Sequence, residues 1–399
     1  MRGLLWVDSE SHPFFKERQQ VQNDTNVVIS ATSSSTPVER VLKMGQDAEK
    51  LYFQSTAGRR LYDAKFGIAV TVVKCMDGRV DWSEASNSPF AWIYPIQTMG
   101  GKLDLGWPAF KPRFARAVRR AAEKQTPMLF VSTYHFSDQH ALCCLGYGKK
   151  TVAAIGGQAK LRDQAERVAS SLYLQGGVRQ VYPILAGINT DNKGLILHGT
   201  GRDEVLATFE FAHLPQEEAE RLVGRRIPQL FPDMPEGIVQ YLIESTMRNW
   251  VIVKTVMENP PEPMALDHNE WILAIGNRMD WIRQRNIAVK IQSWDPEYLS
   301  SARTGARIII SNRDDKERGR SLREEGGVLI VCDSFDEDDE RCDDRAAAVE
   351  SALWTYQDVA RNLRRNNPEI LSVLKPLVGV VSTERRFHRL DVDERLWMA

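Results

Sequence analysis

The first half of the chain alternates short apolar runs with longer amphipathic segments. The apolar runs have the length of buried strands, and the amphipathic segments carry their apolar residues at helical spacing. Strands that alternate with helices predict a mostly parallel sheet, and the ligands of such sheets bind beyond the carboxyl ends of the strands. The predicted strands lie at 67–74, 91–98, 128–134 and 180–187, and the predicted helices lie at 110–124 and 150–174.

The flanking regions are predicted to be helical or unstructured. Residues 20–37 are polar and rich in Ser and Thr, which predicts a disordered lead-in. Residues 37–62 have apolar positions spaced as in an amphipathic helix, and residues 215–257 are expected to form two or more helices. The Pro-rich stretch 260–263 breaks the helical pattern, and we interpret it as a linker.

The last part of the chain resembles the strands of the first half. WILAIGNRMDW (271–281) resembles VVKCMDGRVDW (72–82), AVKIQS (288–293) resembles IYPIQT (93–98), and LIVCDSFDED (329–338) resembles LFVSTYHFSD (129–138). The matches keep an offset of roughly 195–200 residues, which is typical of an internal repeat. The sequence therefore predicts an α/β fold that is present twice.

Composition excludes several classes of protein. The 399 residues are enough for two or three domains. Lys and Arg total 52 against 53 for Asp and Glu, which argues against a dedicated nucleic-acid binder. The N-terminus lacks the apolar stretch of a secretory signal, and the apolar runs are too short to cross a membrane. Five cysteines in a chain of this size do not form a disulfide framework, so we expect a reduced, cytoplasmic protein.

Three residues in the first half could bind a metal. Cys75 and His135 directly follow predicted strands, and Cys144 lies a short distance further on. Two thiolates and one imidazole suit zinc, and a catalytic zinc site leaves its fourth position to water. In the later copy, Asn277 or a neighbour stands near the place of Cys75 and Phe335 takes that of His135. Only Cys342 falls near the second cysteine there, so we expect no metal in that copy.

Asp77 and Arg79 follow Cys75 at intervals of two residues. In an extended turn, residues i and i+2 share a face, so Asp77 can reach a zinc-bound water while Arg79 pairs with it. Because Arg is always protonated, the pair should keep Asp77 ionised as a hydrogen-bond acceptor. The alternative is a pair of ordinary buried cysteines beside a salt bridge at a turn.

These motifs resemble a known family. CMDGR followed by a His/Cys pair resembles the β-carbonic anhydrases, which are zinc enzymes. The segment YHFSDQHALCCLGYG (134–148) more closely resembles the carboxysome shell carbonic anhydrases, and INTD (188–191) is similar to a motif after their next strand. The resemblance covers about 60–390 and departs at the N-terminus, where that family has a larger helical domain.

The resemblance implies a β-carbonic-anhydrase-like fold, in which a mostly parallel sheet with flanking helices is present as a catalytic domain and a degenerate copy without metal. We expect a disordered segment and helix at 1–60, the catalytic zinc domain at 61–205, a helical connector at 206–262 and the degenerate copy at 263–399. The apolar strands of that copy need burial, so we expect the two halves to pack as an internal pseudo-dimer.

The choice of ligands has alternatives. The common H-x-x-C motif of the β type is met literally by His140 and Cys143. His135 is favoured because it ends a strand within the matching segment, and Cys144 because a glycine follows it four residues later, as in the shell family. His268 lies in a segment that resembles one bringing a histidine near the active site of that family; the alternative is a solvent-facing histidine.

The implied reaction is the reversible hydration of CO₂ to bicarbonate and a proton. Two alternatives stay open: a hydrolase of carbonyl sulfide or carbon disulfide with the same fold, and a non-catalytic assembly protein with a closed, structural zinc site. We expect CO₂ and bicarbonate as ligands, a homo-oligomer, and neither nucleic-acid nor membrane partners. The shell resemblance adds Rubisco or a carboxysome shell as candidate partners, and the carboxysome as a candidate location.

Overall fold

The structure is a computed structural model that divides the chain into two units, Met1–Thr36 and Pro37–Ala399. It describes 35–108, 110, 111, 114, 118, 121, 125–138, 144–176, 181–201, 204–260, 268–283, 286–314, 326–335, 344–392 and 397, without the side chains of 171–176, 313, 314 and 344. The predicted lead-in at 20–37 and the predicted helix at 110–124 lie mostly outside the described residues, as does most of the Pro-rich break. Within the described part, no helix is long and apolar enough to span a membrane.

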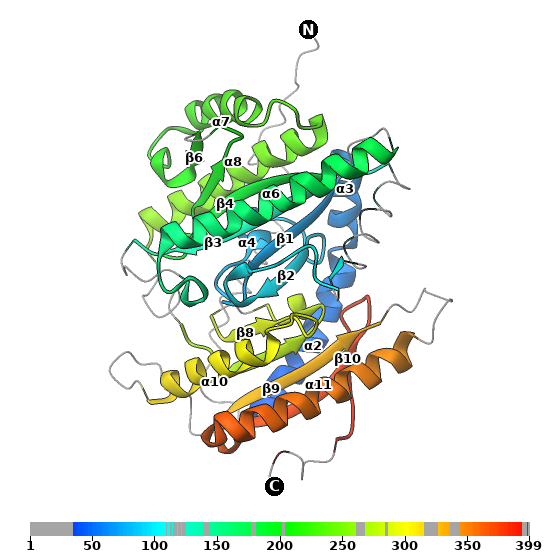
Figure 1. Cartoon of the computed structure of the whole chain (residues 1–399). Helices are drawn as coiled ribbons and strands as arrows, with labels where there is room; N and C mark the ends of the chain where they lie inside the picture. Colours follow the sequence, from blue (N-terminus) through cyan, green and yellow to red (C-terminus); the bar gives the residue numbers. More distant parts are fainter. Residues whose placement is uncertain are drawn as a thin grey trace. The chain divides into compact units, whose positions relative to one another are not determined.

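The first sheet contains the four predicted strands and two more. Its order, in the described residues, is β2-β1-β3-β4-β5-β6 (Figure 1). Strands β1 to β4 pair in parallel, whereas β5 and β6 are antiparallel additions. The central strands are buried on both faces, which explains their unbroken apolar runs. The bounds are β1 (Ala69–Cys75), β2 (Tyr94–Thr98), β3 (Met128–Phe136), β4 (Val181–Asn189), β5 (Leu195–His198) and β6 (Val205–Ala207).

The second sheet repeats the first. Its order, read from one edge among the described residues, is β8-β7-β9-β10-β11, which reproduces β2-β1-β3-β4-β5 down to the final antiparallel strand. The predicted α/β fold with a duplicated, mostly parallel sheet is therefore confirmed. The bounds are β7 (Ile272–Gly276), β8 (Ala288–Ile291), β9 (Gly327–Ser334), β10 (Leu374–Val381) and β11 (Phe387–Arg389).

Helices cover both sheets, in agreement with the amphipathic segments of the sequence. Helix α6 (Thr151–Gly176) packs on β3 and β4, while α10 (Tyr298–Asp314) and α11 (Asp344–Asn366) pack on the second sheet (Figure 1). The region 215–257 forms the expected helices, α7 (Gln216–Leu230) and α8 (Glu236–Glu258). Tyr241 of α8 accepts a hydrogen bond from the indole of Trp82, at 3.0 Å.

The single helix predicted over 37–62 is two helices, α2 (Pro37–Gln54) and α3 (Thr56–Phe66). The break has a physical reason, because the two helices serve different cores. Val41 of α2 is buried in a cluster of the second half that includes Trp281, whereas the ring of Phe66 of α3 packs against Trp92 and Tyr241. The N-terminal end of the described chain is thus part of the C-terminal half.

The two halves contact each other along the edge strands β2 and β8. The backbone N–H of Lys290 donates to the carbonyl of Met76 at 3.0 Å, and that of Gln292 donates to the carbonyl of Gln97 at 2.9 Å. Beyond β8, the ring of Trp294 stacks on a phenylalanine of the first half at a centroid distance of 5.0 Å. These contacts confirm the prediction that the two halves pack against each other.

Candidate metal centre

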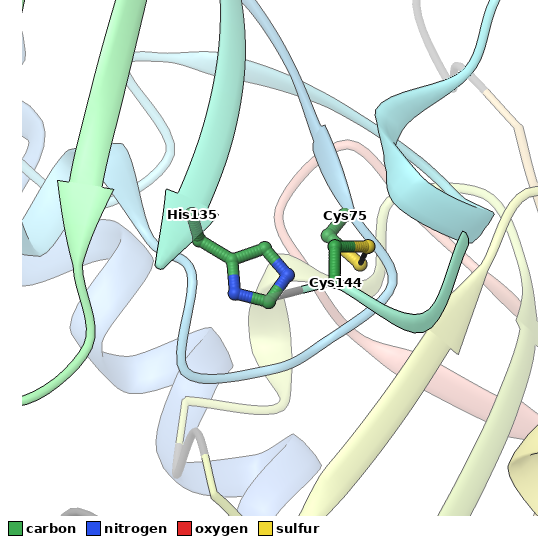
Figure 2. A group of neighbouring side chains, drawn as sticks. All are labelled: Cys75, His135 and Cys144. Atoms are coloured by element: carbon green, nitrogen blue, oxygen red, sulfur yellow. Dashed lines mark hydrogen bonds between the residues drawn. The ribbon is translucent and has the colours of Figure 1, made fainter. Parts of the chain in front are cut away.

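Three of the predicted ligands come together at the carboxyl edge of the first sheet. Cys75 is the last residue of β1, His135 lies next to the end of β3, and Cys144 precedes a short 3₁₀ turn, η2 (Leu145–Tyr147). Because β1 and β3 are parallel neighbours, their ends meet at the same edge. One donor atom from each residue lies within 4.8 Å of the others, all three residues are buried, and the imidazole is directed towards the two sulfurs (Figure 2).

The spacing of this group fits zinc. The two sulfurs are 3.5 Å apart, too far for a disulfide, and both cysteines are free. Two sulfurs each about 2.3 Å from a tetrahedral zinc lie roughly 3.8 Å from each other, close to the observed separation. The group found among the described residues holds these three donors. The alternative ligands His140 and Cys143 lie outside the described residues.

The surroundings of Cys75 change the pKa of its thiol. The hydrogen bond between the two thiol groups lowers the pKa of Cys75 well below its ordinary value, against the opposing effect of burial, and His135 lowers it further. Thiolates are the form of cysteine that binds metals. The surroundings of Cys75 therefore favour the form that a zinc site needs.

Asp77 and Arg79 form the expected ion pair beside the cysteines. Asp77 Oδ1 accepts the backbone N–H of Arg79 at 2.9 Å and its Nε at 3.1 Å, and Oδ2 accepts Nη2 at 2.8 Å. Burial alone would raise the pKa of Asp77, but the guanidinium, helped by His268 and His135, holds it well below the usual range. The carboxyl is thus a fixed, ionised hydrogen-bond acceptor close to Cys75 and His135.

His268 reaches this site from the second half of the chain. Its donor atom lies within 4.8 Å of carboxylate oxygens of both Asp77 and Glu270. The contact between His268 Nδ1 and Glu270 Oε1 is 2.6 Å, and Glu270 Oε2 accepts the Asn312 amide at 2.9 Å. Burial opposes the charged imidazole, but Glu270 and Asp77 outweigh it and raise the pKa of His268 above its ordinary value.

Glu270 was not among the residues singled out from the sequence. It is 1% exposed, and a buried carboxylate needs partners of opposite charge or hydrogen-bond donors. Its only sequence signal is its position two residues after His268, which in an extended segment places both side chains on one face. His268, a candidate from the sequence, lies close to Asp77, and its side chain is partly exposed.

The corresponding edge of the second sheet has different chemistry. Asn277, just after β7, donates to Asp333, which also accepts the Ser351 hydroxyl at 2.5 Å. Phe335 is buried beside the ring of His388. The described residues of this half contain no cluster of three ligands of their own, and Cys342 lies outside the described residues.

Comparisons with known proteins add little to this geometry. No protein-family model matches the sequence, and no curated protein matches it. The solved structure of the β-carbonic anhydrase CcaA is similar over 43% of this chain and 91% of its own length, at 12% identity and a TM-score of 0.31. A likeness of this strength establishes neither a family nor an activity for the chain.

Proposed function

We propose that the chain is a zinc carbonic anhydrase of the β type, a lyase that catalyses the reversible hydration of CO₂ to bicarbonate and a proton. One observation carries the proposal: the donor atoms of Cys75, His135 and Cys144 lie within 4.8 Å of one another, next to the buried Asp77–Arg79 pair. The ligand set supports zinc, and the neighbouring pair supports catalysis, because a closed structural site has no use for a fixed carboxylate.

Zinc, when bound, would supply a Lewis acid that lowers the pKa of water towards neutrality. The residues of the chain would do the rest. Asp77, held ionised by Arg79, accepts a hydrogen bond from the nucleophilic water and orients its lone pair towards CO₂. Arg79 fixes the direction of the carboxylate through three contacts, so this acceptor cannot turn away.

The second half would contribute to proton release. Hydration produces one proton for each bicarbonate, and that proton must reach solvent. The side chain of His268 is 32% exposed, whereas that of Glu270 behind it is 1% exposed. An imidazole that lies near Asp77 and also touches solvent is suited to pass a proton outwards, and Glu270 would orient its ring.

We extend the proposal to the carboxysome shell group on the likeness of 134–148 and 188–191 to that family. Residence in a carboxysome, contact with Rubisco or shell proteins and assembly into a homo-oligomer are parts of this extension. The duplicated fold supports it, since that family also carries a degenerate second copy.

The test is a comparison of substrates on the zinc-loaded full chain. Stopped-flow hydration of CO₂ should be fast, while hydrolysis of carbonyl sulfide and carbon disulfide, followed by sulfide release, should be slow. Cys75→Ser should lose both zinc and CO₂ hydration. A protein that releases sulfide rapidly but hydrates CO₂ slowly would favour the hydrolase, and a zinc-loaded protein inert to all three would favour an assembly role.

A further inference from the structure

A turn of two consecutive glycines lies between the strands that carry the first two ligands. Gly100 and Gly101, just after β2, have φ angles of +75° and +66°, a conformation that glycine adopts without strain. A Cβ atom on Gly101 would lie 3.2 Å from the carbonyl carbon of Lys74 and 3.4 Å from the carbonyl oxygen of Thr133. The turn is thus in contact with the backbone of β1 directly before Cys75 and with that of β3.

The loop of the third ligand rests on the same turn. Gly146, two residues after Cys144, passes so close that a Cβ on it would lie 2.9 Å from the backbone N and Cα of Gly100. The ring of Tyr147 packs over the turn, with carbon atoms 3.1–3.3 Å from where a Cβ on Gly100 would be. All three ligands are therefore connected to one small piece of backbone.

A single side chain of α6 holds this assembly. Gln158 is fully buried, and its Nε2 donates to the carbonyls of both Gly100 and Gly101 at 2.9 Å. The same nitrogen lies 3.1 Å from the hydroxyl of Tyr147. The preceding Gly157 leaves room for the phenol, since a Cβ there would lie 2.3 Å from the Tyr147 ring.

We propose that Gln158 is a positioning residue of the metal centre, which keeps Cys144 at the distance from Cys75 and His135 that one metal ion requires. Buried carbonyls need donors, and Gln158 supplies them to both glycines of the turn. A cavity of about 210 Å³, lined in part by Tyr147, Lys102 and Leu161, adjoins the ring. Without the amide, the ring has space to swing there and draw Cys144 from its place.

The inference rests on the proposed metal site but predicts a property other than turnover. Gln158→Leu keeps the volume of the side chain and removes both hydrogens that hold the turn. Zinc affinity, measured by competition with a chromophoric chelator, should fall about 10–100-fold, the usual effect of losing a group that orients a ligand. With cobalt in place of zinc, the sulfur-to-metal charge-transfer absorption should weaken, because the second thiolate is displaced.

A matched control lies on the same helix. Gln164 lines the same cavity, but the hydrogen bond found for its side chain among the described residues is one accepted from the backbone N–H of Leu105, at 3.5 Å. Gln164→Leu therefore makes the same change without removing a hydrogen bond to either glycine, and it should leave affinity and spectrum unaltered. Tyr147→Phe, which removes one hydroxyl, decides the matter if Gln158→Leu does not fold. Because the two hydrogens of Gln158 Nε2 serve three acceptors, the zinc affinity of this variant should fall by less than for one full hydrogen bond, roughly twofold.

Two results would overturn the inference: a folded Gln158→Leu protein with the zinc affinity and cobalt spectrum of the unaltered chain, or equal losses in the Gln164→Leu control. Where Gln158→Leu does not fold, an unchanged affinity in Tyr147→Phe does the same. An unaltered chain that binds zinc tightly but hydrates no CO₂ would reject the proposed function alone, and the role of Gln158 in metal binding would stand.

Discussion

Replacing Asp77 with Asn separates the catalytic role of this residue from metal binding. The carboxyl is 8% exposed and receives three contacts from Arg79. Breaking a buried ion pair outright costs about 3–5 kcal/mol. Asparagine keeps an oxygen for the backbone N–H and Nε of Arg79 and loses the contact with Nη2. The free energy of unfolding should therefore fall by less, about 2 kcal/mol.

Activity should fall by more than stability. The neutral amide can turn an N–H towards the nucleophile and no longer orients it as an acceptor, so kcat/KM for CO₂ hydration should drop about 10²-fold or more. Zinc content should stay at the level of the unaltered chain, because Asp77 lies outside the ligand group. The assays are stopped-flow hydration, chemical denaturation and elemental analysis on the same preparation.

Asp81→Asn is the matched control. Asp81 accepts the backbone N–H of Glu84 at 3.2 Å, as the cap of a short helix, and pairs with the buried Lys74 at 3.2 Å. Asparagine caps a helix equally well, so this variant also exchanges a buried ion pair for a neutral contact. It should lose stability similarly and keep full activity. The reasoning is refuted if Asp77→Asn retains activity, or if Asp81→Asn loses it to the same extent.

Three further predictions concern the second half of the chain. Glu270→Gln should lower the pKa of His268, which NMR would measure. A raised histidine pKa stabilises the folded state at low pH, and this contribution is lost as the pH rises through the pKa of the folded state. The variant should therefore be less stable than the unaltered chain near pH 6 and equally stable at high pH. Burial raises the pKa of Asp295 to about 6, so its ionisation costs stability increasingly from about pH 4 to pH 6 and in full above that range. Asp295→Asn should then be more stable at pH 8, by about 1 kcal/mol, with no gain below pH 4 in denaturation curves. A fragment ending at Pro260 should aggregate or lack activity, since it exposes the edge that receives β8; a monodisperse, active fragment would contradict the pseudo-dimer.

The sequence predicted the positions of Cys75 and His135 because strand ends can be inferred from the apolar pattern. Cys75 and His135 each close an apolar run, and parallel strands in neighbouring positions bring their ends together whatever the loops do. Cys144 was chosen by its spacing from a glycine, and this spacing does not predict where the sulfur lies in space. The structure places its sulfur 3.5 Å from that of Cys75, a fact that depends on how the loop folds back over the Gly100–Gly101 turn.

The pattern of apolar and polar residues does not predict contacts between residues that are far apart in the sequence. The partnership of His268 with Glu270 could be guessed from their spacing, but their approach to Asp77 depends on how β8 lies against β2. Gln158 donates to backbone carbonyls. Every residue type has such a carbonyl, so the sequence of the turn does not reveal that Gln158 binds it. The break between α2 and α3 was missed for the same reason, because the apolar pattern does not show against which part of the protein each helical turn packs.

The most direct test of the zinc carbonic anhydrase account is X-ray absorption at the zinc edge of the purified full chain, combined with zinc content. The account predicts one zinc per chain, with two sulfurs at about 2.3 Å and two lighter ligands at about 2.0–2.1 Å. Cys75→Ser should abolish this signal. A chain that binds no zinc, binds two, or surrounds zinc with three or more sulfurs would contradict it.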